Sequence, residues 1–166
     1  NEFYAKGIEI FAQLVEEEPK YFENLALILN NMGALKQYQK EYPLAEKYFG
    51  DSLNIRRRLA VDFTTRSLGF LAMGCLNQAK LITEKGNPES ADTYYCEAIE
   101  LYALLCKRDT KFKTDYAIAQ YYRAIALEKT NVEEALKLHN SALEIRLALS
   151  KSNKEALKAD LARSYF

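Results

Sequence analysis

The sequence lacks a hydrophobic run long enough to cross a membrane, and it lacks a basic segment leading into an apolar one at its N-terminus. A membrane helix needs about 20 mostly apolar residues, and a secretory leader needs that basic and apolar pair. A charge excess is also missing, because 23 Lys and Arg residues balance 23 Asp and Glu residues. A neutral chain has no long-range field to attract nucleic acid or an anionic membrane. Both are therefore disfavoured as partners, and we expect a cytoplasmic protein.

Residues that carry catalysis or bind metals are scarce. His139 is the single histidine, and the three cysteines, Cys75, Cys96 and Cys106, have no CxxC spacing. An odd number of cysteines without metal-like neighbours favours free thiols in a reducing compartment. The sequence contains no glycine-rich phosphate loop and no Ser/His/Asp set. We therefore predict that the protein is not an enzyme and holds no cofactor and no metal.

The sequence does contain an octet, an eight-residue pattern that occurs four times in similar form. It reads GIEIFAQL from Gly7, SLNIRRRL from Ser52, AIELYALL from Ala98 and ALEIRLAL from Ala142, so successive copies start 45, 46 and 44 residues apart. A ring stands three residues before each copy, at Tyr4, Phe49, Tyr95 and His139. A second motif shares the period, with alanines at Ala26, Ala72, Ala117 and Ala162. Two motifs with one period indicate a repeat array.

Both motifs predict helices, because small or ring residues recur at i, i+4 and i+7 and share one helical face. The predicted helices cover residues 2–17, 21–40, 43–61, 65–85, 88–107, 112–129 and 132–150, with an eighth begun near residue 153. Asn131 with Glu134 and Ser152 with Glu155 have the spacing of helix N-terminal caps. The run from Gly86 to Pro88 supplies a helix stop, a cap and a first-turn proline.

The repeated unit resembles the tetratricopeptide repeat, a helical pair with a small residue late in its first helix and the pattern A-x3-aromatic-x2-A in its second. The small residues are Gly33, Ala79 and Ala124, and the pattern is carried by Ala45-Phe49-Ser52, Ala91-Tyr95-Ala98 and Ala135-His139-Ala142. The unit exceeds the usual length of about 34 residues and lacks the family's tryptophan and proline. It therefore resembles the long-repeat type of kinesin-light-chain-like and bacterial arrays. The resemblance implies an all-α, right-handed α-α superhelix with a concave groove.

The domain organisation that we predict is a single array across residues 1–166. Partial repeats at 1–20 and 153–166 flank three complete repeats at about 21–64, 65–110 and 111–152. Because the chain opens within a predicted helix, we expect it to be a fragment of a longer protein.

The same resemblance implies that the first helix of each repeat lines the groove. The positions carried over are Leu27, Asn30, Asn31, Gln37, Met73, Asn77, Lys80, Ile118, Tyr121 and Tyr122. Asn31 and Asn77 share one repeat position, where an amide can pair with the backbone of a bound peptide or with a neighbouring helix or water. Tyr121 and Tyr122 make the C-terminal half of the groove aromatic, unless Tyr122 packs under the next repeat.

Two other groups have structural interpretations. His139 stands where the other repeats have a ring, so we expect it to serve packing. The run Arg56, Arg57 and Arg58 has the charge to contact an anion, but it lies among acidic residues on a second helix, and we expect a solvated outer face instead.

The favoured function is a protein-interaction module that binds a peptide segment or a partner domain in the groove. A peptide-sensing domain that controls an attached effector is one alternative. A structural spacer or a self-association element, using the terminal half-repeats, is the other.

Overall fold

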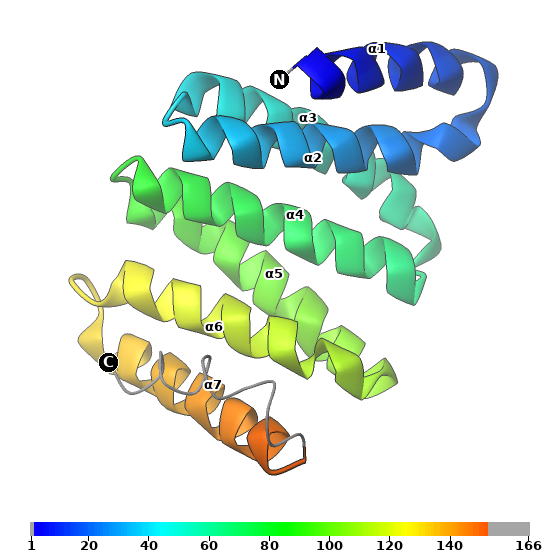
Figure 1. Ribbon diagram of the computed structural model, residues 1–166. Helices are drawn as coiled ribbons and strands as arrows, with labels where there is room; N and C mark the ends of the chain where they lie inside the picture. The colour runs from blue at the N-terminus through cyan, green and yellow to red at the C-terminus, as the bar shows by residue number, and fades with distance from the viewer. Residues whose placement is uncertain (1, 153–166) are drawn as a thin grey trace.

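The computed structural model describes residues 2–152, and this part of the chain is an all-α solenoid without strands (Figure 1). Its helices are α1 (Glu2–Glu17), α2 (Phe22–Tyr38), α3 (Tyr42–Leu59), α4 (Thr65–Glu84), α5 (Pro88–Arg108), α6 (Lys113–Leu127) and α7 (Val132–Ser152). Short 3-10 turns, η1 (Pro19–Tyr21), η2 (Ala60–Asp62) and η3 (Thr110–Phe112), precede α2, α4 and α6. Every predicted helix end in this range lies within two residues of the observed end. The predicted eighth helix and the Ser152–Glu155 cap fall outside the described residues.

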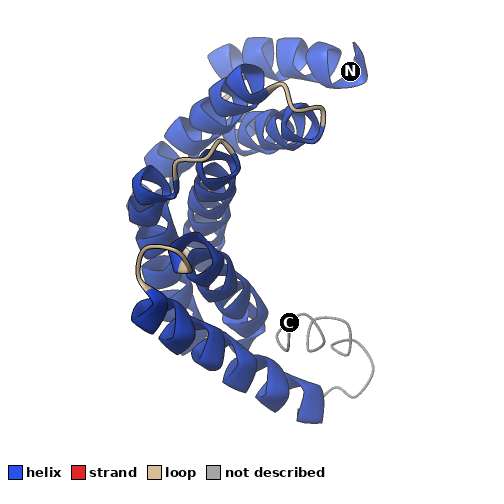
Figure 2. Ribbon diagram, turned by 90° about the vertical axis from the view of Figure 1, so that its left-hand side faces the viewer, coloured by secondary structure: helices blue, strands red, loops and turns tan. Residues whose placement is uncertain are grey.

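The helices form two layers. Packing is most extensive within the pairs α2–α3, α4–α5 and α6–α7. In Figure 1, α2 and α4 lie in front of α3 and α5, and α7 lies below α6. The side view in Figure 2 shows that the layers curve into a crescent, with the layer of α2, α4 and α6 on the inner side. Side chains of these three helices are therefore the ones that a ligand inside the crescent would meet.

Local capping explains where two of these helices begin. The Asn131 side chain accepts a hydrogen bond from the Glu134 backbone N–H (3.1 Å), as the spacing predicted. Asn87 accepts one from the Ser90 N–H (3.4 Å), and Pro88 is the first residue of α5. Gly86 closes α4 at φ +86°, a conformation that glycine adopts without strain. These caps separate α4 from α5 and α6 from α7 with short loops, so the helices of each pair pack against each other.

Close helix packing depends on the small residues of the repeat. A Cβ atom on Gly33 would lie 2.6 Å from the Phe49 ring, so only glycine fits at this crossing of α2 and α3. Ala79 and Ala91 occupy the corresponding crossing of α4 and α5 and are fully buried. Ser52 stands in place of the repeat's alanine and donates a hydrogen bond from its hydroxyl to the Ala26 carbonyl (2.6 Å). Small size at these positions sets the distance between the two layers.

Leucine at Ala91 or Ala135 is expected to lower the free energy of unfolding by about 1–3 kcal/mol, because both alanines are buried and the larger side chain overpacks the interface. Denaturant unfolding of Ala91→Leu and Ala135→Leu measures the change. Ala12→Leu on the exposed face of α1 is the control and should stay within about 0.5 kcal/mol. Equal stability of all three variants would refute the role of the small residues.

The core is densest around α4 and α5, where the largest fully buried side chains include Tyr95, Leu68 and Leu105. By contrast, α1 has no buried residue, although it packs on α2. The three cysteines, all within the described range, are free thiols. No helix among residues 2–152 has the length and apolar character that crossing a bilayer requires.

Candidate partner-binding groove

The N-terminal part of the predicted groove lies on α2. Leu27 is 44% exposed although it is apolar, and Asn31 one turn later is also exposed. Asn30 is buried instead, and its side-chain oxygen accepts a hydrogen bond from the Asn77 amide of α4 (2.9 Å). Asn77 therefore uses one amide proton to join two neighbouring first helices. Asn31 is exposed and its side-chain amide has no such partner among the described residues. Asn31 and Asn77, which share one repeat position, therefore differ in their hydrogen bonding.

Gln37 lies at the end of α2 and also reaches α4. Its amide donates to a carboxylate oxygen of Glu84 (2.6 Å), and the other Glu84 oxygen accepts from the Tyr42 hydroxyl (3.1 Å). These bonds lie on the exposed surface. Like the Asn30–Asn77 pair, they tie successive repeats together along the inner layer.

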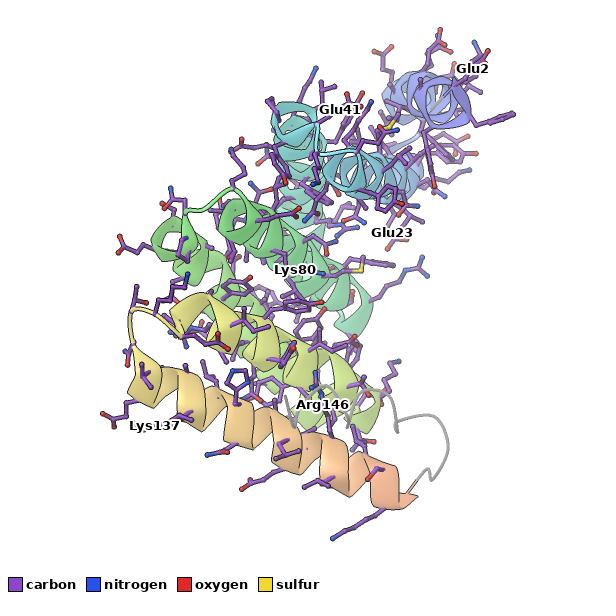
Figure 3. The ribbon with its side chains drawn as sticks, turned by 60° about the vertical axis from the view of Figure 1, so that its left-hand side comes forward. Glu2, Glu23, Glu41, Lys80, Lys137 and Arg146 are labelled. Atoms are coloured by element: carbon purple, nitrogen blue, oxygen red, sulfur yellow. The ribbon has the colours of Figure 1, made fainter. Side chains whose placement is uncertain are left out.

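Two adjacent aromatic rings lie between two cations in the C-terminal part of the predicted groove. The Lys80 ammonium lies 4.3 Å from the centre of the Tyr122 ring, and the Arg146 guanidinium lies 4.8 Å from that of Tyr121. Figure 3 shows Lys80 on α4 and Arg146 on α7, on either side of α6, which carries both tyrosines. The two rings meet edge to face at 5.5 Å. All of Lys80, Tyr121 and Tyr122 are partly exposed. The two tyrosine rings therefore pack against neighbouring side chains and are also partly accessible to solvent.

His139 joins this aromatic cluster. Its ring meets the Tyr121 ring edge to face at 5.7 Å, and its Nε2 lies 3.3 Å from a Glu128 carboxylate oxygen. The side chain is half-buried. The histidine thus packs on its neighbours, as its repeat position predicted.

Two pockets open between neighbouring first helices. The Met73 pocket, of ≈ 560 Å³, lies between α4 and the start of α6 and is lined by Thr65, Arg66, Gly69, Phe70, Met73, Leu76, Tyr102, Lys111, Phe112 and Asp115. The Arg56 pocket, of ≈ 80 Å³, lies between α2 and α4 and is lined by Glu23, Asn24, Ala26, Leu27, Arg56, Leu59, Arg66, Ser67 and Phe70. Ile118 is half-buried against the core and lines neither pocket.

Residues of these pockets were missed by the sequence reasoning. Phe70 and Arg66 line both pockets, and Glu23 lines one of them. The positions carried over from the family begin one turn later on each helix, at Leu27, Met73 and Ile118. A signal was present, because Phe70 stands one turn before Met73 on the same helical face.

The expectation that Arg56 lies on a solvated outer face is wrong. Arg56 is only 2% exposed; its Nη1 donates to the Phe70 backbone carbonyl (3.0 Å), and its guanidinium lies 5.8 Å from the centre of the Phe70 ring. Burial lowers the pKa of Arg56 to about 10. The physical reason is its place in the octet, whose fifth residue faces the core. Its neighbours Arg57 and Arg58 are exposed, and Arg57 pairs with Glu97 of α5 (2.6 Å).

The described residues contain no cluster of three or more His, Cys, Asp or Glu side chains that could hold a metal ion. At each cysteine, burial outweighs the nearby cation that would lower the thiol pKa and activate a nucleophile. Burial raises the pKa of Cys75 to about 12, and burial likewise raises the pKa values of Cys96 and Cys106. Raised thiol pKa values keep all three cysteines protonated at neutral pH.

A family match to one helical pair agrees with this architecture. Residues 25–62, which span most of α2 and all of α3, match the family model of the tetratricopeptide repeat. A search of curated proteins found no significant match. Among solved structures the chain is similar to BtubC (BKLC) from P. vanneervenii, with a TM-score of 0.49 and 18% sequence identity over 98% of this chain and 77% of that one. The family match thus falls on one helical pair, α2–α3, which the pairs α4–α5 and α6–α7 follow in the described part of the chain.

Proposed function

We propose that the protein binds a peptide segment or a domain of a protein partner along the inner side of the crescent. Tetratricopeptide repeats generally mediate protein–protein interaction, and this fold is typically not catalytic. The observation that carries the proposal is the exposure of apolar side chains on the inner helices, above all Leu27 of α2. An exposed leucine that lines a pocket is typical of a binding surface.

The amides of the inner layer suit the backbone of an extended chain. Asn31 is exposed and has both a donor and an acceptor for a peptide group. Asn77 has one amide proton committed to Asn30, and its oxygen accepts no bond from the described residues. Asn31 is therefore the stronger contributor of the two. In this arrangement the asparagines position the ligand backbone, while the pockets select its side chains.

The aromatic half of the groove suits apolar or aromatic ligand side chains. Tyr121 and Tyr122 offer partly exposed rings that neighbouring cations already hold in place. Rings that are ordered before binding lose little conformational entropy on binding. Lys80 and Tyr122 are accordingly expected to contact the ligand together.

Asparagine substitutions test the groove directly. We expect Asn31→Ala to weaken binding by about five- to hundredfold, because an unpaired peptide group costs about 1–3 kcal/mol. The ligand is a peptide selected on the protein from a displayed random library, with affinity measured by fluorescence anisotropy. Asn54→Ala, an exposed asparagine on the outer helix α3, is the matched control and should bind normally. Loss of binding in Asn54→Ala alone would move the site to the outer layer.

Self-association is a second candidate function. No residue of α1 is buried, and Phe3 is 92% exposed on it, next to the partly exposed Tyr4 and Ile10. An apolar face of this kind favours contact with a second copy or a further repeat. Sedimentation velocity of the protein and of Phe3→Glu with Ile10→Glu tests this. A monomer at all concentrations would exclude self-association through α1.

Partner class and location complete the proposal. The net charge of zero supports a protein partner rather than nucleic acid or a membrane surface. The three free thiols support a reducing compartment such as the cytoplasm. Imaging of the tagged protein in cells tests the location.

A further inference from the structure

Arg56 is a buried cation without a carboxylate partner. Its Nη1 bonds to the Phe70 carbonyl (3.0 Å), but its buried Nη2 has no hydrogen-bond partner. Buried charges in proteins are normally paired, because an unpaired charge loses its hydration without compensation. An unsatisfied guanidinium nitrogen in a well-packed helical interface therefore needs an explanation.

Packing alone does not require an arginine at this position. The fifth residue of the octet is Arg56 in one repeat, Tyr102 in the next and Arg146 in the last. Tyr102 is as deeply buried as Arg56, with 3% of its surface exposed, so a neutral ring fills the same place in the fold. Arg146 is also buried, but its guanidinium stacks on the Tyr121 ring. The fold therefore does not require a positive charge at the position of Arg56.

The Arg56 pocket is lined with groups that suit an anion. Asn24 lines it with a side-chain amide that makes no hydrogen bond to the described residues. Arg66 stands at the same pocket and donates two hydrogen bonds to Glu23 (2.8 and 2.6 Å). That pair is exposed, and exposed ion pairs open at little cost in free energy. With two arginines and one glutamate the lining has a net charge of +1.

We propose that the Arg56 pocket binds the side-chain carboxylate of an aspartate or glutamate from the protein partner. The inference rests on the proposed function, since the pocket opens between the two inner helices α2 and α4. The carboxylate accepts hydrogen bonds from Nη2 of Arg56 and from the Asn24 amide, and Arg66 lies at the rim of the pocket. Because Nη2 is shielded in the unliganded protein, binding requires a pocket side chain to move. Phe70 is that side chain, because its half-buried ring lies against both guanidinium groups, at 5.8 and 5.6 Å.

The size of the pocket favours a side chain over a chain terminus. A space of ≈ 80 Å³ accommodates one small group. In an aspartate or glutamate side chain the carboxylate is attached to narrow methylene groups, so it fits a small space. A C-terminal carboxylate brings the side chain of its own residue on the adjacent carbon and needs more room.

Titration with small molecules tests the pocket without any knowledge of the partner. The probe is N-acetyl-aspartate amide, followed through the arginine side-chain NMR signals of the whole protein at constant ionic strength. We expect a saturable shift of the Arg56 signals, and no saturable shift with the neutral isostere N-acetyl-asparagine amide. N-acetyl-glycine, which offers a terminal carboxylate, should bind more weakly. Equal responses to the acid and its amide, or a linear response that sodium chloride reproduces, would overturn the proposal and leave Nη2 bonded to water alone.

Substitutions assign the effect to the pocket. Arg56→Met keeps the side-chain volume and should abolish the saturable response, whereas Arg146→Met removes an arginine at the same repeat position and should retain it. Circular dichroism and cooperative unfolding check that both variants fold. Asn24→Ala changes an exposed residue and should weaken the response even if Arg56→Met were unfolded. Retention of the response in both Arg56→Met and Asn24→Ala would refute the site.

Peptides selected on the protein separate this inference from the proposed function. We expect a change of one acidic residue in such a peptide to its amide to weaken binding at least tenfold in the wild type but not in Arg56→Met. If no acidic residue matters to peptides that bind the groove, the groove function stands and the inference fails. If N-acetyl-aspartate amide binds while no peptide contacts the inner face, the groove function fails and the carboxylate pocket stands.

Discussion

Replacement of Phe49 by alanine is expected to lower the free energy of unfolding by about 3–5 kcal/mol. Phe49 is 3% exposed and forms a small core cluster with Ala45 and Leu81, which Tyr42 covers. Its ring fills the space that Gly33 leaves open. Removal of the ring therefore creates a cavity between α2 and α3 that fixed helix backbones cannot close.

The repeat supplies a matched control for this substitution. Tyr4 occupies the same repeat position in α1 and is 36% exposed, so Tyr4→Ala should cost less than about 1 kcal/mol. Urea unfolding of both variants measures the difference. Equal effects of the two substitutions would show that the ring position contributes through helix propensity and not through packing.

A double-mutant cycle isolates the contact itself. A methyl group on Gly33 collides with the Phe49 ring in the wild type, so Gly33→Ala should be destabilising there. In the Phe49→Ala background the collision is absent, and alanine should then stabilise α2 by up to about 1 kcal/mol through helix propensity. The change of sign is expected because the two residues share one space.

Alkaline pH is expected to destabilise the protein strongly, beginning near pH 9. Burial, assisted by Glu97, raises the pKa of Cys75 from 9.0 to about 12. Above pH 9 the unfolded chain releases this proton while the folded chain retains it, so the free energy of unfolding falls as pH rises. The loss from this thiol is about 1.4 kcal/mol for each pH unit between its unfolded and folded pKa values.

Other buried groups shape the pH profile. Burial raises the pKa values of Tyr95 and Tyr102, so both add to the loss of stability above pH 10, where unfolded tyrosines ionise. Arg56 acts in the opposite direction. Its folded pKa of about 10 lies below its ordinary 12.5, so above pH 10 the folded state loses the buried charge first and regains stability. The Cys75 effect is therefore cleanest between pH 9 and 10.

Denaturant unfolding at pH 8, 9, 9.5 and 10 tests the thiol effect. Cys75→Ala should flatten the decline between pH 9 and 10, because it removes the titrating group. Cys106→Ala serves as the control, since Cys106 is only half-buried and should leave most of the decline in place. A decline of unchanged slope in Cys75→Ala would exclude Cys75 as its cause.

The repeat and its helices were predictable from the sequence because their signals are local. The Asn131 cap, the Gly86 stop and the spacing of Ala91 and Ala135 act through neighbouring backbone groups or through helical periodicity. Such features do not depend on the rest of the fold. For this reason the predicted helix ends agree with the structure to within two residues.

The inner side of the crescent was predictable only as a layer of helices. Periodicity places Asn30 and Asn31 side by side on α2, but it does not say that Asn30 turns to Asn77 of the next repeat while Asn31 stays exposed. That choice depends on the distance and rotation between α2 and α4. Both are results of packing along the whole solenoid.

Arg56 marks the limit of what the sequence by itself determined. Within the run of three arginines, composition predicts solvent for every member, because charged side chains are rarely buried. The octet periodicity determined that its fifth residue faces the next repeat, and Tyr102 at the same position follows the ordinary rule for a core ring. Only the tertiary structure decided that the Arg56 guanidinium is buried beside Phe70 with Nη2 unpaired. Phe70 of the next helix supplies the carbonyl and the ring, and residues of α2 and α4 supply most of the pocket walls. Local pattern thus determined helices, repeats and faces, whereas long-range packing decided which polar groups became paired, buried or available to a ligand.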